Sequence, residues 1–212
     1  MPGSGRGFQQ KLDRVLIGMG FHQCTAEKAA YVRHADEHGG RIIVATYVDD
    51  IVCMTSDENR RREWMEGMTK AFKSVKFQDD LDWMLNMEIV HGTNSLGKRT
   101  VSLSQRLGID KILGQVGNIS RTRSKIIPMN PTANPTKRSE DDPKENQNIH
   151  GFKYATVVGG LMYIANWTRP DLATAVNKLA RYLTDPTDQH YELLIEVVQY
   201  LEKTKDRKLT YT

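Results

Sequence analysis

Two adjacent acids, Asp49 and Asp50, follow Tyr47 and Val48 between two apolar runs. Residues 41–48 and 51–55 are rich in β-branched and apolar side chains, so both are predicted to be strands. Two strands joined by only two residues form a β-hairpin, and both carboxylates should therefore lie at its tip. Carboxylate oxygens are the ligands that Mg²⁺ and Mn²⁺ prefer. A pair of such ions, roughly 3.5–4 Å apart, is the arrangement that catalyses nucleotidyl transfer.

A solvated turn is the alternative interpretation of the same four residues. Asp is a common turn residue, and an Asp-Asp pair alone is well explained by turn chemistry. The two flanking runs, however, are apolar on both faces, which is typical of strands held in a core rather than of a surface hairpin. Residues 47–50 are therefore a candidate catalytic tip that buried strands would hold rigidly.

The elements around this tip predict an α+β chain. Apolar spacing favours a helix over residues 9–19 and another after a cap at Ser56 or Asp57. The further predicted elements are strands at 29–33, 83–90 and 100–103, helices at 105–113, 152–165, 170–183 and 187–201, and a strand-like end at 208–211. Gly159 and Gly160 should allow another element to approach one of these helices closely.

Positive charge is concentrated in the middle of the chain. Residues 97–138 hold nine Lys and Arg against the single acid Asp110, a local net charge of +8 in a chain of net charge +4. Such a stretch can neutralise nucleic-acid phosphates without reading sequence, although a solvated charged face is the alternative. The candidate backbone contacts are Lys98, Arg99, Arg106, Lys111, Arg121, Arg123 and Lys125. Four prolines and an acidic run make residues 127–147 an extended linker.

Composition excludes several classes of protein. Two cysteines, Cys24 and Cys53, cannot build a disulfide framework, and no His/Cys spacing indicates zinc. No run reaches the ~18 apolar residues that a membrane span needs. We therefore expect a soluble intracellular protein without membrane partners.

Several motifs together resemble the reverse transcriptases of copia-type LTR retrotransposons. They are KLDRVLIGMGFHQC at 11–24, IVATYVDDIVCMTS at 43–56, WMLNMEI at 83–89 and VSLSQ at 101–105. The most specific is VVGGLMYIANWTRPDLATAVNKLARYL at 157–183. YVDD followed at this distance by the TRPD segment distinguishes the family far better than YVDD alone.

The resemblance implies an α+β fold with an incomplete palm sheet that carries the YVDD hairpin. Residues 1–104 would be the partial palm with a primer-grip-like hairpin, 105–147 a basic thumb-like segment and linker, and 148–212 a helical connection towards an absent ribonuclease H domain. Asp49 and Asp50 would be catalytic ligands of Mg²⁺ or Mn²⁺, with Tyr47 and Val48 near the primer terminus or nucleotide. Residues 83–89 would position the primer; for Trp83, Met84 and Met87, core packing is the alternative.

The resemblance further implies RNA-directed DNA synthesis. The partners would be an RNA or DNA template with its primer, deoxynucleoside triphosphates and the rest of a Pol polyprotein, in the cytoplasm, a virus-like particle or the nucleus. In the family an earlier palm strand carries a third carboxylate, and neither Asp13 nor Asp36 follows an apolar strand. We therefore expect the chain to be inactive alone, the alternative being a non-catalytic nucleic-acid-binding remnant.

Overall fold

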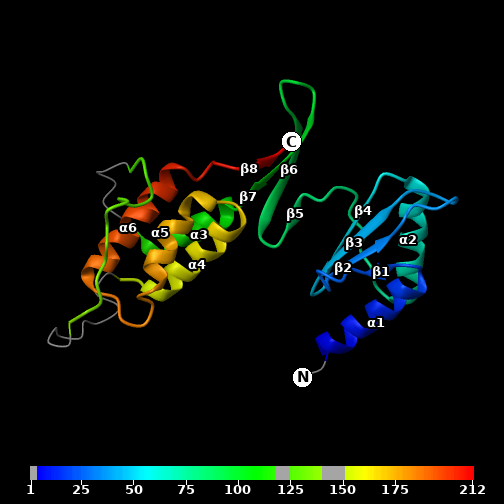
Figure 1. Cartoon of the computed structure of the whole chain (residues 1–212), viewed down its shortest axis with the longest axis horizontal. Helices are drawn as coiled ribbons and strands as arrows, with labels where there is room; N and C mark the ends of the chain where they lie inside the picture. Colours follow the sequence, from blue (N-terminus) through cyan, green and yellow to red (C-terminus); the bar gives the residue numbers. More distant parts are fainter. Residues whose placement is uncertain (1–3, 118–124, 140–150) are drawn as a thin grey trace. The chain divides into compact units, whose positions relative to one another are not determined.

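The chain forms two compact units, Met1–Asp80 and Leu81–Thr212 (Figure 1). The computed structural model describes residues 4–117, 125–139 and 151–212. The fold is mixed α+β, and each unit contains one antiparallel sheet of four strands. The boundary between the units lies within residues 1–104, the segment that we expected to form one partial palm.

The N-terminal unit is a four-stranded sheet with two helices. In chain order its elements are α1 (Ser4–Gly18), β1 (His22–Gln23), β2 (Ala30–Arg33), β3 (Ile42–Tyr47), β4 (Asp50–Thr55) and α2 (Glu58–Ala71). The strand order β1-β2-β3-β4 makes β4 an edge strand. Helix α1 begins at Ser4, earlier than the predicted start at residue 9.

Both helices of this unit pack on the same face of the sheet. Leu12 and Leu16 of α1 and Trp64 and Met68 of α2 share one buried cluster with Tyr31, Ile42 and Val44 of the strands. Because Tyr31 is the cross-strand partner of Val44, these strand residues lie on a single face. The opposite face of the sheet is therefore left without a helix from this unit.

The C-terminal unit combines a second sheet with a helical core. Its elements are β5 (Trp83–Met84), β6 (Met87–Thr93), β7 (Arg99–Ser104), α3 (Arg106–Val116), α4 (Tyr154–Trp167), the 3₁₀ turn η1 (Pro170–Leu172), α5 (Ala173–Ala180), α6 (Asp188–Lys203) and β8 (Leu209–Tyr211). The predicted strand-like end is confirmed, since β8 pairs with β7. Among the described residues, no helix has the length and apolar character that crossing a membrane requires.

One prediction for this unit is wrong. The expected strand 83–90 is interrupted at Leu85 and Asn86, and its two parts pair with each other as the short hairpin β5–β6. Periodicity did not reveal the interruption, because a turn of Leu and Asn contains no Gly or Pro to mark it.

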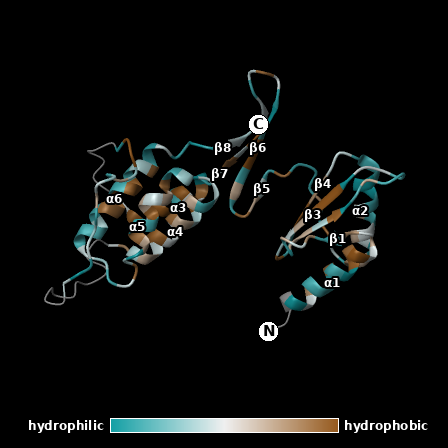
Figure 2. Ribbon diagram, viewed as in Figure 1, coloured by the Kyte–Doolittle hydropathy of each residue, from teal (hydrophilic) through white to brown (hydrophobic). Residues whose placement is uncertain are grey.

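The helices α3 to α6 enclose the larger of the two cores. Leu161, Leu179 and Val198 are fully buried within it, and Figure 2 shows apolar residues along these helices. The expected close approach occurs at Gly160, where an added Cβ would lie 3.0 Å from Cδ1 of Ile112 on α3. The glycine thus lets α3 and α4 approach each other.

A buried arginine joins η1 to the end of α6. Arg169, only 2% exposed, donates two hydrogen bonds to the Asp171 carboxylate, at 2.9 and 2.7 Å. It also donates to the backbone oxygen and the hydroxyl of Thr204, while the Tyr200 hydroxyl donates to Asp171 at 2.7 Å. Burial opposes ionisation of Asp171, but the bonds from Arg169 and Tyr200 prevail and lower its pKa. Arg169 and Asp171 of the TRPD sequence therefore hold two helix ends together.

His190 caps α6 from the first turn. Its Nδ1 accepts a hydrogen bond from the backbone N–H of Thr187 at 2.9 Å, and its ring lies 4.0 Å from that of Tyr182. An Nδ1 that accepts a bond from an N–H carries no proton of its own. Burial first, and then the positive charge of Arg138, lower the pKa of His190, while Asp185 opposes the shift.

The lowered pKa of His190 predicts that the C-terminal unit loses stability in mild acid. Well above pH ~6.5 the imidazole is neutral in both states, so it causes no pH dependence there. Below that pH the unfolded chain binds a proton that the folded chain excludes, and the free energy of unfolding falls by up to ~1.4 kcal/mol per pH unit. Urea unfolding followed by circular dichroism at several pH values measures this slope. His190→Gln should flatten it, and the exposed His91→Gln should not; equal slopes in all three proteins would contradict the prediction.

Candidate functional site

The β3–β4 hairpin carries the candidate catalytic acids at its tip. The strands pair from Ile42 opposite Thr55 to Tyr47 opposite Asp50. The two connecting residues are therefore Val48 and Asp49, one position earlier than the predicted Asp49-Asp50, and Asp50 begins β4. Val48 has a φ of 53°, in the left-handed region that a β-branched residue rarely adopts. The tight connection is made at the expense of backbone strain beside both acids.

Strand alternation decides where the tip residues point. Ile42, Val44 and Thr46 are buried on the helix-covered face, and Ile51 and Cys53 of β4 pack against the same core. Burial raises the pKa of the Cys53 thiol to about 11, so this cysteine behaves as a small core residue. Tyr47 (55% exposed) and Asp50 consequently lie on the open face, and Val48 and Asp49 at the tip are exposed as well.

The two acids would provide only part of a two-ion site. Mg²⁺ is commonly bound by one or two carboxylates, with phosphates and water as its other ligands. Asp49 and Asp50 could supply the carboxylates for one such ion. Two ions need more ligands, and within residues 4–117, 125–139 and 151–212 no group of three or more His, Cys, Asp or Glu is placed to hold a metal. These residues alone therefore do not complete a two-ion site.

Two other aspartates of the N-terminal unit are engaged elsewhere. Asp13 accepts a short hydrogen bond from the hydroxyl of Tyr31, on the helix-covered face. Asp36 pairs with Arg60 beyond the start of β3. Since β3 advances about 3.3 Å per residue, this end lies roughly 17 Å from Tyr47. Neither carboxylate can serve the hairpin tip.

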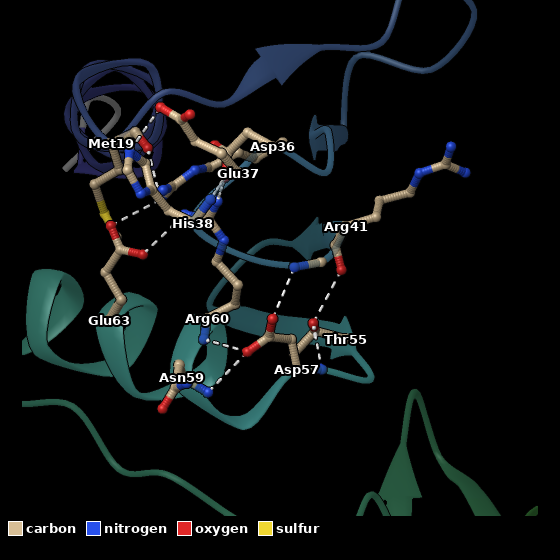
Figure 3. Close-up of polar contacts among 12 residues, drawn as sticks. Met19, Asp36, Glu37, His38, Arg41, Thr55, Asp57, Asn59, Arg60 and Glu63 are labelled. Carbon is tan, nitrogen blue, oxygen red and sulfur yellow. Dashed lines mark hydrogen bonds and ion pairs between the residues drawn. The ribbon is translucent and has the colours of Figure 1, made fainter.

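The end of the hairpin away from the tip is fixed by a network of charged residues (Figure 3). The Asp57 carboxylate caps α2 by accepting the N–H groups of Asn59 and Arg60, and it also accepts the N–H of Gly40 at 2.7 Å. Arg60, only 2% exposed, pairs with Asp36 and with Glu63 at 3.1 Å. One carboxylate and one guanidinium thus bind the β2–β3 loop to the helix that follows β4. A run of three arginines at 60–62 gives no sign in the sequence of which one is buried.

The β5–β6 hairpin contains the residues expected to position a primer. Trp83 is 44% exposed, Met84 is half-buried and Met87 is only 5% exposed. Of the two interpretations, core packing suits Met87 and surface contact suits Trp83. The turn between the strands, Leu85-Asn86, has φ values of 52° and 56°. Two-residue hairpin turns require such left-handed residues, and Asn adopts this conformation more readily than Leu.

The predicted basic residues divide into exposed and ion-paired groups. Lys98, Arg99 and Lys111 are exposed on the β6–β7 hairpin and on α3. Arg106 pairs with Asp206 and with Asp110, and Lys125 lies 2.5 Å from Glu196. Arg121 and Arg123 lie outside the described residues. Charges already paired within the protein are weaker candidates for phosphate binding than the exposed three.

Sequence reasoning missed one contact of the β5–β6 hairpin. The hydroxyl of Tyr163, on α4, donates a hydrogen bond to the backbone oxygen of Leu85 at 2.5 Å. Tyr163 does not belong to the apolar face of its helix, and it is 38% exposed. The only sign of this contact in the sequence was a tyrosine outside the apolar face of its helix, because the hydroxyl of such a tyrosine can donate a hydrogen bond to another element.

Comparison with known proteins identifies the family. The family model described as "Reverse transcriptase (RNA-dependent DNA polymerase)" matches residues 1–131. The retrovirus-related Pol polyprotein from transposon RE2 of Arabidopsis thaliana is 31% identical over 95% of this chain and 13% of its own length. The Pol polyprotein from transposon RE1 of Arabidopsis thaliana is 28% identical over 94% of this chain and 13% of its own length. The Pol polyprotein from transposon TNT 1-94 of Nicotiana tabacum is 26% identical over 94% of this chain and 15% of its own length. No solved structure matches the chain significantly.

The chain therefore belongs to the reverse transcriptase family. Its relatives place it among the copia-type retrotransposon Pol polyproteins, as the sequence motifs predicted. The chain spans only about 13–15% of the length of these relatives.

The geometry predicts that the tip acids are dispensable for stability, in contrast to Asp57. Asp49→Asn and Asp50→Asn, both at exposed positions, should change the opening free energy of the β3–β4 amides by less than about 0.5 kcal/mol. Asp57→Ala removes the α2 cap and the bond from Gly40, and should cost about 1–2 kcal/mol. Native-state hydrogen exchange of β3 and β4 measures both effects. A loss in the Asp49 or Asp50 variant as large as that in Asp57→Ala would give these acids a structural role instead.

Proposed function

We propose that this chain is part of an RNA-directed DNA polymerase of a copia-type element, with Asp49 and Asp50 as metal ligands of its active site. The observation that carries the proposal is the β3–β4 hairpin, with two exposed acids at the tip of strands buried on one face. It lies within the segment that matches the reverse transcriptase family. An apolar hairpin fixed by Asp57 and Arg60 at its other end suits a site that must hold ligands rigidly.

Metal binding is assigned to the tip together with another segment. Reverse transcriptases of this family generally use divalent ions, and we assign Mg²⁺ or Mn²⁺ here. Asp49 and Asp50 supply two carboxylates, and a third comes from another part of a longer Pol polyprotein. When this third carboxylate joins Asp49 and Asp50 at a rigid hairpin tip, the ligands of the metal site are preorganised. The 212-residue chain alone is accordingly expected to be inactive.

Tyr47 and Val48 are assigned to the primer end or the incoming nucleotide. Tyr47 shares the open face with Asp50, its cross-strand partner, and Val48 is 68% exposed. The same face continues along the strands through Ile43, Ala45 and Val52, which gives an apolar floor beside the acids. An aromatic ring next to metal-binding carboxylates suits stacking against a base or a sugar.

Duplex binding is assigned to the exposed cations of the C-terminal unit and to the β5–β6 hairpin. Lys98 and Arg99 lie together at the β6–β7 turn, and Lys111 is exposed on α3. Contacts from these side chains to phosphates need no particular base sequence, as copying any template requires. We assign the β5–β6 hairpin, with its residues Trp83, Met84 and Met87, to contact with the primer strand. Of these three side chains, Trp83 is the exposed one.

A non-catalytic nucleic-acid-binding protein is the second candidate function. It is favoured by one observation, namely that the described residues place no third acid with Asp49 and Asp50. In that case the basic surface would bind template and primer without any synthesis. The two candidates agree on binding and differ on catalysis by a longer chain.

Primer extension distinguishes the two candidates. With Mg²⁺ or Mn²⁺ and deoxynucleoside triphosphates, the 212-residue chain should bind a template–primer but not extend it. A chain lengthened upstream in its own reading frame should extend the primer, and Asp49→Asn should lower that rate at least ~100-fold. Asp13→Asn is the control that should leave the rate within a few-fold. A lengthened chain that binds but never extends would contradict the polymerase assignment in favour of the second candidate.

Salt dependence tests the phosphate contacts. For a DNA duplex, the slope of log K against log salt falls by about 0.9 for each phosphate contact removed. Lys98→Gln and Arg99→Gln should each reduce the slope by about this amount. The matched control is Arg106→Gln, which removes a cation already paired with Asp206 and should leave the slope unchanged. Affinity that does not respond to salt would exclude this surface as the duplex-binding site.

A further inference from the structure

The turn of the β5–β6 hairpin has an unfavourable backbone conformation. Leu85 and Asn86 are both left-handed, with φ values of 52° and 56°, although neither is glycine. For a residue with a Cβ this conformation is less favourable than the right-handed region. Short β5 contributes only two paired residues, Trp83 opposite Glu88 and Met84 opposite Met87. Because so few backbone hydrogen bonds join β5 to β6, they stabilise this turn only weakly. We therefore expect a further contact that holds the turn in place.

Tyr163 provides that contact from a distant part of the chain. Its hydroxyl donates to the backbone oxygen of Leu85 at 2.5 Å, across 78 positions of sequence. Leu85 lies in the turn, outside the β5–β6 ladder, so its carbonyl has no cross-strand partner. The Tyr163 ring in turn lies 6.3 Å from that of Trp167, one helical turn further along α4. The hydroxyl is thus presented from a ring supported by its own helix.

The rest of the same sheet is attached to the helical core by separate contacts. Strand β8, which follows α6, pairs with β7, and the Ser102 and Thr210 hydroxyls are 2.8 Å apart. Lys208 lies 3.8 Å from the carboxylate of Glu88 on β6. These contacts hold β6 and β7, whereas the turn of the β5–β6 hairpin is contacted by Tyr163.

We propose that Tyr163 is a positioning residue that fixes the β5–β6 turn on α4 and so sets where Trp83 meets the primer strand. The inference rests on the proposed function for its primer role, whereas the fixing of the turn stands on geometry within the C-terminal unit. The hydroxyl is the group that matters, since the Leu85 carbonyl needs a donor. Phenylalanine at this position would keep the ring against Trp167 and leave the turn free to move.

Hydrogen exchange and primer cross-linking together test the proposal on the full chain. In Tyr163→Phe, the amides of Met87 and Ile89 should exchange about five-fold faster, the effect of one lost hydrogen bond. With a photoreactive nucleotide at the primer 3′ end, cross-linking to residues 81–93 should fall by a similar factor. Duplex affinity should change less than about two-fold, because the exposed cations that dominate it are untouched.

The matched control is Tyr182→Phe, which removes a bond of the same kind in the same unit. The Tyr182 hydroxyl donates to the Pro135 carbonyl at 2.5 Å, and neither residue belongs to the hairpin. This variant should leave both the exchange rates and the cross-linking at wild-type levels. Unchanged exchange in Tyr163→Phe, or equal loss of cross-linking in both variants, would overturn the proposal. Absence of any cross-link in the wild type would overturn the primer role itself, while the exchange rates still decide whether Tyr163 fixes the turn.

Discussion

Burial of a single face of the β3–β4 hairpin is the constraint on which the N-terminal unit depends. Ile42, Val44 and Thr46 alternate with half-buried residues, so a shift of one residue in register would expose the core side chains. The register therefore fixes Tyr47 opposite Asp50 and places both acids at the tip. The same alternation gives the hairpin an uncovered apolar face beside the acids. Stability and the geometry of the candidate site are thus set by the same pairing.

Ion pairing decides which charges remain available for function. The sequence shows a local charge of +8, but Lys125 is paired with an acid of α6, and Arg106 with an acid of the segment that follows this helix. Arg60 and Arg169 are buried and bind carboxylates within their own units. Buried arginines act through fixed geometry, since their fork of donors can bind a carboxylate and backbone oxygens together. Exposed cations such as Lys98 and Arg99 contribute little to folding and are the ones that we propose to bind phosphates.

Periodicity predicted most helices and strands, and it failed where a turn lacked the usual residues. The apolar stripes of α2 and α4 and the alternation of β3 follow directly from one-sided burial. Periodicity did not mark the turn at Leu85-Asn86, where only the resemblance implied a hairpin, because the turn contains no glycine and is contacted by a distant tyrosine. The two tip acids were found from sequence because local pairing alone brings them together. The Arg60 network and the Tyr163 contact join residues far apart in the chain, which no local pattern records.

The geometry of the sheet restricts where a further carboxylate can join Asp49 and Asp50. On the β2 side of the tip, the backbone oxygen of Ala29 accepts the N–H of Thr46 at 2.8 Å, and the Glu27 carboxylate is bonded to the N–H of Ala29. That side is therefore occupied by the turn that enters β2. On the other side, β4 is the edge of the sheet, with its outer backbone groups unpaired by any strand of its unit. Under the proposed function, a strand that adds an acid to the tip would pair along β4, beside Asp50, where it would also cover an edge prone to association.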